Sequence, residues 1–391
     1  MRVVDVNEFY SPTGGGVRTY LDRKMGIMAD LGHELIVIAP GRANAVEERP
    51  GGGVIHWIKA PRLPFDRSYG LFWDAEPVTR LLDGLDPDVV EVSSPWRPAW
   101  IVGNWQGRAL KVFFAHNDNM AAYAQRWLEG VASRDQVERW FAWYTRYMGR
   151  FLDQFDAFVT NGSELAKRHE RRGLKVDAAM PLGIEKTHFS PDLRDPALRA
   201  ALLEQCGLPE DAHLLLGVGR HHPEKRWPTV FDAVEAAGED MPVGMILLGD
   251  GVDRAVLTKR VAGSPHIRLF RPVYERLRFA RIMASADALI HGSDAEPFGL
   301  VALEAVASGL PLIVPDEGGA AEIAEPTFAE TYRARDARSC AAAIRRLFAR
   351  EPAILRAASV HAAGKVRTDR DHAIALIDYY SGLLDARRRA A

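Results

Sequence analysis

The stretch Ser-Asp-Ala-Glu-Pro-Phe-Gly-Leu-Val-Ala-Leu-Glu at residues 293–304 decides the fold, because it joins a predicted strand to a predicted helix. The apolar run at 288–291 predicts a buried strand just before it, and the apolar pattern at 300–307 predicts a helix. Glu296 is therefore expected on the loop at the carboxyl end of a strand, and Glu304 in the helix that follows. Ligands of open α/β sheets bind at that edge, and the start of a helix offers them free N–H groups.

The rest of the chain repeats this alternation of short apolar runs and helical stretches, which is typical of parallel βαβ layers. The strands predicted in the first half cover residues 3–6, 35–39, 54–58, 89–92, 111–114 and 157–160. Those predicted in the second half cover residues 214–218, 245–248, 267–270, 288–291 and 312–314. We therefore predict the α/β class with doubly wound parallel sheets.

The length of 391 residues exceeds one comfortable hydrophobic core, so two domains are expected. Residues 191–209 are poor in strand pattern and contain three prolines, and we predict the linker there. The first domain would cover residues 1–190 and the second 210–371, and a closing helix would occupy residues 372–391.

The composition is that of an ordinary globular protein, with 47% hydrophobic and 26% charged residues. A formal net charge of −2 gives no reason to expect nucleic acid as a partner. Cys206 and Cys340 cannot form a disulfide framework and are expected as small buried side chains. A strand pattern follows Met1 without a secretory signal, and no apolar run approaches the ~20 residues of a membrane-spanning helix. We expect a cytoplasmic protein and leave open a peripheral contact with the inner face of the cytoplasmic membrane.

The string from Glu296 to Glu304 resembles the Glu-x7-Glu signature of the retaining family-4 glycosyltransferases of the GT-B fold. That resemblance implies two Rossmann-like domains facing across a cleft, with the closing helix packed on the first domain. It also implies that Glu296 lies beside the donor sugar and that Glu304 binds the ribose hydroxyls of a nucleotide-diphosphate sugar. Backbone N–H groups of Phe298, Gly299 and Leu300 would hold the sugar hydroxyls. Without the resemblance, Glu296 could equally be a surface loop residue and Glu304 a solvated helix residue.

A second motif, Gly-Val-Gly-Arg-His-His-Pro-Glu-Lys-Arg at residues 217–226, opens the second domain. It lacks the third glycine of a dinucleotide fingerprint. It is similar to the family's Gly-Arg…Glu-Lys-Gly segment, which implies that Arg220 and Lys225 bind the donor diphosphate; Arg226 stands where a glycine is usual. Fixed cations there would stabilise the leaving diphosphate, so we expect neither a metal nor a cofactor. The segment around Val273 corresponds to the part of the family that holds the nucleobase.

The first domain contributes two candidate elements. Three glycines precede a helix predicted at residues 17–31, and they fit either a flexible turn or a phosphate site. The resemblance implies that Gly15 and Gly16 line the donor diphosphate and the acceptor cleft. His116 follows a predicted strand, where a lone histidine is more often a packing residue. The resemblance implies that its imidazole contacts the donor sugar near the reacting carbon, where it can donate or accept a hydrogen bond.

Residues 60–69 and 86–95 resemble one branch of the family, the sulfoquinovosyl transferases and bacterial lipid mannosyltransferases of glycolipid synthesis. Glu91 stands where members of that branch usually carry histidine. The resemblance implies a donor of the GDP-mannose or UDP-glucose type. It also implies an acceptor that is a membrane lipid or a lipid-linked glycan.

Residues 125–155 are rich in aromatic and arginine residues. Trp140, Trp143, Tyr144 and Tyr147 have the i, i+3, i+4, i+7 spacing of one helix face. That face could pack on the domain core, or it could lie at a lipid interface with arginines beside the headgroups.

We therefore predict a retaining hexosyltransferase that proceeds by same-face attack, assisted by the leaving phosphate oxygen. The alternatives are a nucleotide-sugar epimerase, a sugar phosphorylase of the same fold and a non-catalytic subunit. An epimerase would act without an acceptor, and a phosphorylase would need inorganic phosphate.

Overall fold

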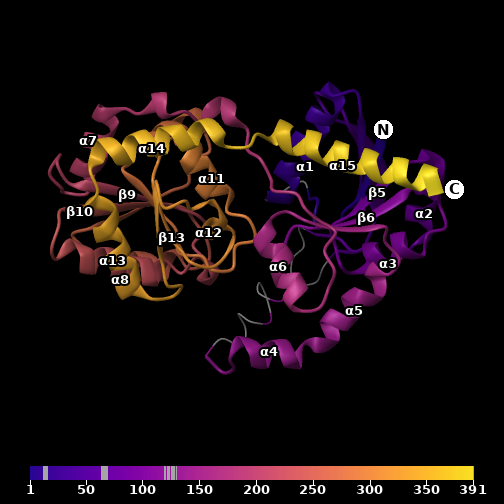
Figure 1. The fold of residues 1–391 in the computed structure, drawn as a ribbon, viewed down its shortest axis with the longest axis horizontal. Coiled ribbons are helices and arrows are strands. Elements are labelled where there is room, and N and C mark those ends of the chain that lie inside the picture. Colours follow the sequence, from indigo (N-terminus) through magenta and orange to yellow (C-terminus); the bar gives the residue numbers. More distant parts are fainter. Residues whose placement is uncertain are drawn as a thin grey trace. The chain divides into compact units, whose positions relative to one another are not determined.

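A computed structural model describes residues 1–11, 16–62, 69–118, 120, 124, 128 and 130–390, apart from the side chain of Arg134. The chain forms two compact units (Figure 1). The first comprises Met1–Pro181 with Asp369–Ala391, and the second comprises Leu182–Thr368. Within the described residues, no helix is both long enough and apolar enough to cross a membrane.

The first unit is built on a sheet with the strand order β3-β4-β2-β1-β5-β6-β7-β8. Every neighbouring pair is parallel except β3 and β4. The strands are β1 (Arg2–Val6), β2 (Glu34–Gly41), β3 (Ala45–Glu48), β4 (Val54–Lys59), β5 (Val89–Val92), β6 (Leu110–Ala115), β7 (Ala157–Thr160) and β8 (Ala178–Ala179). The inner strands are buried on both faces, as parallel sheets covered by helices require.

Helices cover this sheet, and the last helix of the chain is one of them. They are α1 (Gly16–Asp30), α2 (Glu76–Leu85), α3 (Arg97–Asn104), α4 (Arg134–Trp140), α5 (Ala142–Leu152), α6 (Ser163–Arg171) and α15 (Asp369–Ala390). In Figure 1 α15, in yellow, lies beside α1, and the two helices are in contact. Leu376, Ile377 and Tyr380 bury α15 in the same core cluster as Leu21 and Met25 of α1. The closing helix is therefore an integral part of the first unit.

The second unit has the strand order β11-β10-β9-β12-β13-β14, and all of its pairs are parallel. Its strands are β9 (His213–Val218), β10 (Val243–Leu248), β11 (Ile267–Phe270), β12 (Ala288–Ile290), β13 (Leu312–Pro315) and β14 (Ala329–Tyr332). This is the doubly wound order of dinucleotide-binding folds, and the direction of winding changes between β9 and β12. The sheet of the first unit changes direction in the same way between β1 and β5.

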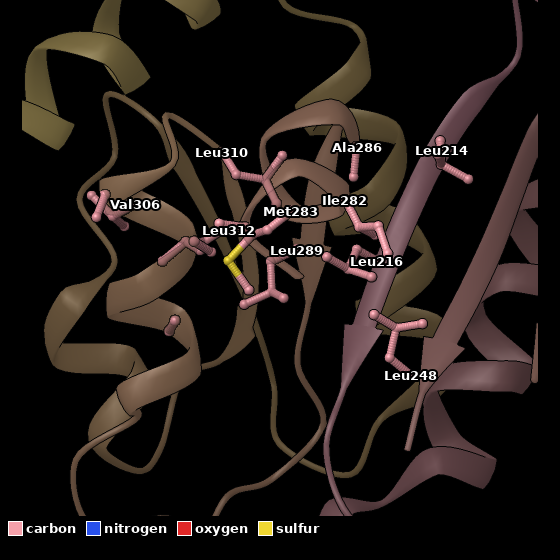
Figure 2. Close-up of a cluster of buried hydrophobic side chains, with 14 of the residues drawn as sticks. Leu214, Leu216, Leu248, Ile282, Met283, Ala286, Leu289, Val306, Leu310 and Leu312 are labelled. Atoms are coloured by element: carbon pink, nitrogen blue, oxygen red, sulfur yellow. The ribbon is translucent and has the colours of Figure 1, made fainter. Parts of the chain in front are cut away.

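Helices also cover the second sheet: α7 (Pro196–Gln205), α8 (Trp227–Gly238), α9 (Arg254–Val261), α10 (Arg276–Ser285), α11 (Leu300–Ala307), α12 (Gly319–Ile323), α13 (Ala337–Phe348) and α14 (Pro352–Lys365). Figure 2 shows one face of this core, where Met283 of α10 and Val306 of α11 belong to one cluster with the strand residues Leu216, Leu289 and Leu312. The strands predicted from apolar runs are all present, whereas β3, β8 and β14 were not predicted.

The predicted linker at residues 191–209 does not separate the two units. The chain passes between them at residues 181–182 and 368–369, and residues 191–209 lie within the second unit. The prolines misled the prediction: two of them occupy the first turn of a short 3₁₀ helix (Pro191–Leu193) and of α7, where proline is favoured. Leu203 of α7 is fully buried, so this segment contributes to the core.

An ion-paired cluster fastens the same segment to the sheet. Asp287 accepts hydrogen bonds from Arg194 at 2.9 Å, from Arg199 at 2.7 Å and from the backbone N–H of Leu214 at 2.8 Å. Burial alone would raise the pKa of Asp287. The hydrogen bonds from Arg199 and from the N–H of Leu214 lower the pKa by more than burial raises it, so the net shift is downward. Asp287 is therefore a buried anion that depends on its partners.

The aromatic stretch divides its residues between core and surface. Helix α4 ends at Trp140 and α5 begins at Ala142, while residues 125–127 and 129 lie outside the described residues. Tyr144 and Met148 are buried, whereas Trp140 is 56% and Trp143 51% exposed. We call the exposed set the α5 surface; it consists of Arg139, Trp140, Trp143, Arg146 and Arg150. The buried Tyr144 agrees with the interpretation that this stretch packs on the domain core. The interpretation as a lipid interface stays a prediction for the exposed residues.

Replacing Asp287 with alanine should lower the free energy of unfolding by about 3 kcal/mol, because two partly buried arginines and the N–H of Leu214 lose their partner. Because the pKa of Asp287 is lowered in the folded state, this contribution is present above its ordinary pKa of about 4 and is lost as the pH falls further. Urea denaturation at pH 7 and pH 3 measures both effects. The control is Asp232→Ala at a half-exposed pair with Arg260, which should cost under about 1 kcal/mol. Equal losses for the two variants would contradict the prediction.

Candidate active site

The switch point of the second unit brings together two side chains that lie 71 residues apart in the sequence. Lys225 follows β9, and Glu296 follows the neighbouring strand β12. Lys225 Nζ donates a 2.7 Å hydrogen bond to Glu296 Oε2, and both side chains are largely buried. Because neighbouring parallel strands end at one edge of the sheet, the two predicted residues meet there.

Glu296 is held as an anion. Its Oε2 also lies 3.0 Å from His291 Nε2, at the end of β12. Burial would raise the pKa of Glu296, but the charge of Lys225 and the contact with His291 bring it well below its ordinary value. Glu296 can therefore accept hydrogen bonds and cannot supply a proton near neutral pH. His291 was predicted only as the last residue of a strand, without a role in the site.

The loop that carries Glu296 is shaped by glycines. Gly299 caps the amino terminus of α11 with a φ of +85°, a conformation that side chains other than hydrogen disfavour. The N–H of Gly319 donates a 2.7 Å hydrogen bond to the carbonyl oxygen of Glu296. A Cβ atom at Gly319 would lie 2.3 Å from Cα of Phe298, so only glycine allows this approach. The predicted donor-site residues Phe298, Gly299 and Leu300 thus form the entry into α11. Gly319 was not predicted, because it is the first residue of α12, far from Glu296 in the sequence.

A second buried anion stabilises the same loop. Asp294 is 2% exposed and contacts Arg226 Nε at 3.4 Å and Arg335 Nη2 at 2.7 Å. Arg226 has a φ of +52°, in the left-handed region that favours glycine. This conformation explains why a glycine is usual at that position. Here the arginine bears the backbone strain, and its side chain reaches Asp294.

Glu304 lies on α11 with its carboxylate near the start of α10. Its Oε1 is 3.1 Å from Arg276 Nη2, and its side chain is 12% exposed. The Arg276 guanidinium also stacks over the Phe189 ring at 4.8 Å. Val273, the predicted base-site residue, is half-buried on the connection between β11 and α10. Arg276 was not predicted, because nothing in the sequence links it to Glu304.

The two predicted cations differ in their surroundings. The Arg220 side chain is 71% exposed and donates a 2.6 Å hydrogen bond to Glu224, whereas the Lys225 side chain is 14% exposed. Arg220 is thus paired with Glu224 near the surface, whereas Lys225 is paired with Glu296. Its backbone carbonyl accepts a hydrogen bond from Trp227 Nε1, which anchors the loop after β9 on the core.

In the first unit, His116 follows β6, and aromatic rings surround it. The ring centroids of Phe114 and Tyr20 lie 4.4 Å and 5.0 Å from that of His116, and its carbonyl accepts a 3.0 Å hydrogen bond from Asn161. Burial, with smaller effects of Lys24 and His372, lowers the pKa of His116 to about 3. The imidazole is therefore neutral near pH 7. Gly16 is the exposed first residue of α1, and Gly15 lies outside the described residues.

A small pocket lies beside His116, with apolar walls and a few polar groups. Its lining includes Phe9, Tyr144 and Met148 together with Ser93 and His169. Ser93 Oγ and both ring nitrogens of His169 are buried and have no hydrogen-bond partner in the described part of the chain. Buried polar atoms are normally hydrogen-bonded, so these atoms could bind a polar group of a ligand or a water molecule.

Glu91, where the related branch usually has histidine, is a buried charge in the core of the first unit. Lys24 Nζ donates 2.6 Å hydrogen bonds to both of its carboxylate oxygens, and the Tyr380 hydroxyl donates one of 2.7 Å. Both charged side chains are 2% exposed. The glutamate thereby joins α1, β5 and α15. It is not part of the lining of the pocket beside His116.

The chain resembles solved structures along nearly its whole length. Sucrose-phosphate synthase from Thermosynechococcus elongatus superposes with a TM-score of 0.76 at 17% identity, covering 99% of this chain and 100% of that one. Anabaena HepE in complex with UDP gives a TM-score of 0.71 at 15% identity, covering 98% and 100%. Together with two doubly wound parallel sheets, these similarities define the GT-B fold of the glycosyltransferases.

Two family models match the sequence: glycosyltransferase family 4 over residues 14–179 and glycosyl transferases group 1 over residues 212–350. A GDP-mannose-dependent alpha-mannosyltransferase of Mycolicibacterium smegmatis is 30% identical over 83% of this chain and 82% of its own length. A GDP-mannose-dependent alpha-(1-6)-phosphatidylinositol dimannoside mannosyltransferase of Mycobacterium tuberculosis is 28% identical over 83% and 81%. The chain belongs to glycosyltransferase family 4 and is a transferase that uses a nucleotide sugar.

The Lys225–Glu296 pair should show strong energetic coupling. Lys225→Met and Glu296→Gln should each cost about 2 kcal/mol of unfolding free energy, because each leaves a buried polar partner behind. The double variant should cost at least about 1 kcal/mol less than the sum of the two losses. Urea denaturation of the four proteins gives this coupling, and the exposed pair of Arg345 and Asp240 serves as the control. Additive losses at Lys225 and Glu296 would show that the pair does not hold the loop.

Proposed function

We propose that the protein is a retaining glycosyltransferase that transfers mannose from GDP-mannose to a hydroxyl group of a membrane lipid or lipid-linked glycan. The observation that carries the proposal is the Lys225–Glu296 pair at the switch point, directly before the amino terminus of α11. It combines a cation for the leaving diphosphate with an ionised acceptor for sugar hydroxyls, and free backbone N–H groups lie next to them.

Each predicted site residue then has a role that its chemistry permits. Lys225 and the exposed Arg220 would bind the diphosphate, and Glu304, oriented by Arg276, would accept hydrogen bonds from the ribose hydroxyls. Glu296 would accept them from the donor sugar. Each such bond to a charged group contributes about 1.5–3 kcal/mol. Gly15, Gly16 and Val273 would line the diphosphate and the base.

His116 would face the reacting end of the sugar in the neutral form. A neutral ring donates one N–H to a sugar oxygen and places no competing cation next to the carbon that gains positive charge. The acceptor oxygen forms its bond to the anomeric carbon as the bond from that carbon to the phosphate oxygen breaks. The acceptor proton passes to the leaving phosphate on the same face, and the configuration at the anomeric carbon is retained.

The leaving group needs no metal ion in this proposal. Arg220 and Lys225 supply positive charge at the diphosphate from fixed positions after β9. We therefore propose that chelating agents leave turnover unchanged.

The choice of donor rests on relatives whose names include GDP-mannose, at 30% and 28% identity over most of the chain. The purified protein should release GDP from GDP-mannose several-fold faster than UDP from UDP-glucose, and lipid extract should accelerate the release. Proton NMR of the product should show the α-anomer, the configuration of the donor. An inverted product would contradict retention, and a preference for UDP-glucose would contradict the donor assignment.

Two variants test whether that activity depends on the proposed site. Glu296→Gln keeps the shape of the side chain but removes its charge, and should lower kcat/KM at least ~100-fold, equivalent to about 2.7 kcal/mol. Asp232→Ala, at an exposed pair on α8, should leave kcat/KM unchanged.

The acceptor proposal is supported by the α5 surface and by the relative named for a phosphatidylinositol dimannoside acceptor. Exposed tryptophans beside arginines suit the boundary of an anionic membrane. Glu138 of helix α4 lies near these arginines, but it is paired with Arg172 at 3.1 Å. Its charge is therefore already compensated and does not cancel the arginine charges of the α5 surface. We propose that this surface rests on the anionic headgroups of the membrane that supplies the acceptor.

Arg146→Glu should weaken binding to vesicles that contain phosphatidylglycerol by more than about fivefold, because each basic residue near such a surface contributes about 1 kcal/mol and the added glutamate is repelled by the headgroups. Co-sedimentation at low and high salt measures the binding. The matched control is Lys259→Glu, the same charge change on an exposed residue of α9. If both variants weaken binding equally, net charge rather than the α5 surface is responsible.

A further inference from the structure

The chain passes between the compact units at residues 181–182 and 368–369, and hydrogen bonds connect these two segments within each unit. In the second unit, the N–H of Ile184 donates a 3.2 Å hydrogen bond to the carbonyl of Arg367. In the first unit, His372 Nδ1 lies 3.0 Å from the carbonyl oxygen of Pro181, the last residue before the chain leaves that unit. His372 belongs to the first turn of α15 and is 2% exposed. A buried side chain is therefore in direct contact with the backbone where the chain leaves the first unit.

His372 passes this contact on to Tyr20 of α1. A carbonyl oxygen can only accept a hydrogen bond, so Nδ1 of His372 carries a proton and donates to Pro181. The Tyr20 hydroxyl lies 3.0 Å from Nε2 of the same ring. Burial raises the pKa of Tyr20 well above 10, so its hydroxyl keeps its proton. In the neutral form of the His372 ring Nε2 is an acceptor, and the Tyr20 hydroxyl donates to it.

Tyr20 in turn contacts His116. The two ring centroids lie 5.0 Å apart in an edge-on arrangement, and Tyr20 also stacks with Phe114 at 6.4 Å. Lys24 Nζ lies 5.6 Å from the centroid of the Tyr20 ring, where its bonds to Glu91 hold it. The Tyr20 ring thus packs between Phe114, His116 and Lys24, so its position and that of His116 depend on each other.

We propose that Tyr20 is a positioning residue for His116, and that the contacts Pro181–His372–Tyr20–His116 couple the passage between the two units to the reacting end of the donor sugar. The proposal rests on the function proposed above for His116. A backbone change at Pro181 would move His372, then the Tyr20 ring, and finally the imidazole that it contacts. The position of the His116 imidazole would thereby depend on the backbone conformation at Pro181. Tyr20 would transmit this dependence without contacting the ligand itself.

Tyr20→Phe tests the coupling, because it keeps the ring and removes only the hydroxyl. It should lower kcat about tenfold for GDP release from GDP-mannose, with KM for the donor unchanged within about twofold, since the loss is in the reacting geometry. His372→Ala should cause a similar loss, and the double variant should lose no more than either single variant. Independent losses that multiply would overturn the proposal.

The matched control is Tyr380→Phe, which also removes a hydroxyl that ties α15 to the sheet but acts through Glu91. It should lower the melting temperature and leave kcat within about twofold of the wild type. Equal loss of kcat in Tyr380→Phe and Tyr20→Phe would mean that anchoring α15 is all that matters, and would overturn the proposal.

Two further measurements separate this proposal from the proposed function. If His116→Ala retains full turnover, the role of His116 is wrong; if it loses turnover while Tyr20→Phe retains it, only the coupling is wrong. Nitrogen-15 NMR of the histidine rings needs no turnover at all. It should show His372 as the neutral ring with its proton on Nδ1, and a proton on Nε2 instead would overturn the coupling.

Discussion

Two parallel strands that wind in opposite directions from one point impose the main constraint on this molecule. At the switch between β9 and β12, neither following helix covers the sheet edge, and the loops after both strands meet there. Lys225 and Glu296 meet because of that topology, and the start of α11 lies next to them. The placement of these charged groups in the second unit therefore depends on the order of its strands.

Buried charges hold the loops at this edge, and each is compensated. At this edge Glu296 has Lys225 and His291, and Asp294 has two arginines. At the opposite edge of the sheet, Asp287 precedes β12 and fastens α7 there. Removing a charge from water costs several kcal/mol, so an unpaired partner would be intolerable and the pairs specify one arrangement of the loops. In the first unit the Lys24–Glu91 pair serves the same end, because it joins a helix, a strand and the closing helix α15.

Close backbone approach and aromatic packing complete the positioning. Gly299 and Gly319 let two loops touch where any side chain would collide, so the carboxylate of Glu296 has a rigid support. In the first unit, rings rather than charges hold His116, and burial keeps it neutral. Glu296 in the second unit is thus ionised, and His116 in the first unit is neutral.

The sequence by itself determined the strands, the α/β class and the helix at 300–307, because apolar periodicity is a local feature. It also placed Lys225 and Glu296 after strands and Glu304 in the helix that follows, where the structure has them. It misplaced the unit boundary, because proline in the first turn of a helix looks like proline in a linker. Only the tertiary structure decided that His291 would contact Glu296, that Arg276 would reach Glu304, and that Tyr20 would lie between His372 and His116. These partners lie on different elements, and no local pattern encodes which buried groups the packing of a sheet and its helices will bring within hydrogen-bond distance.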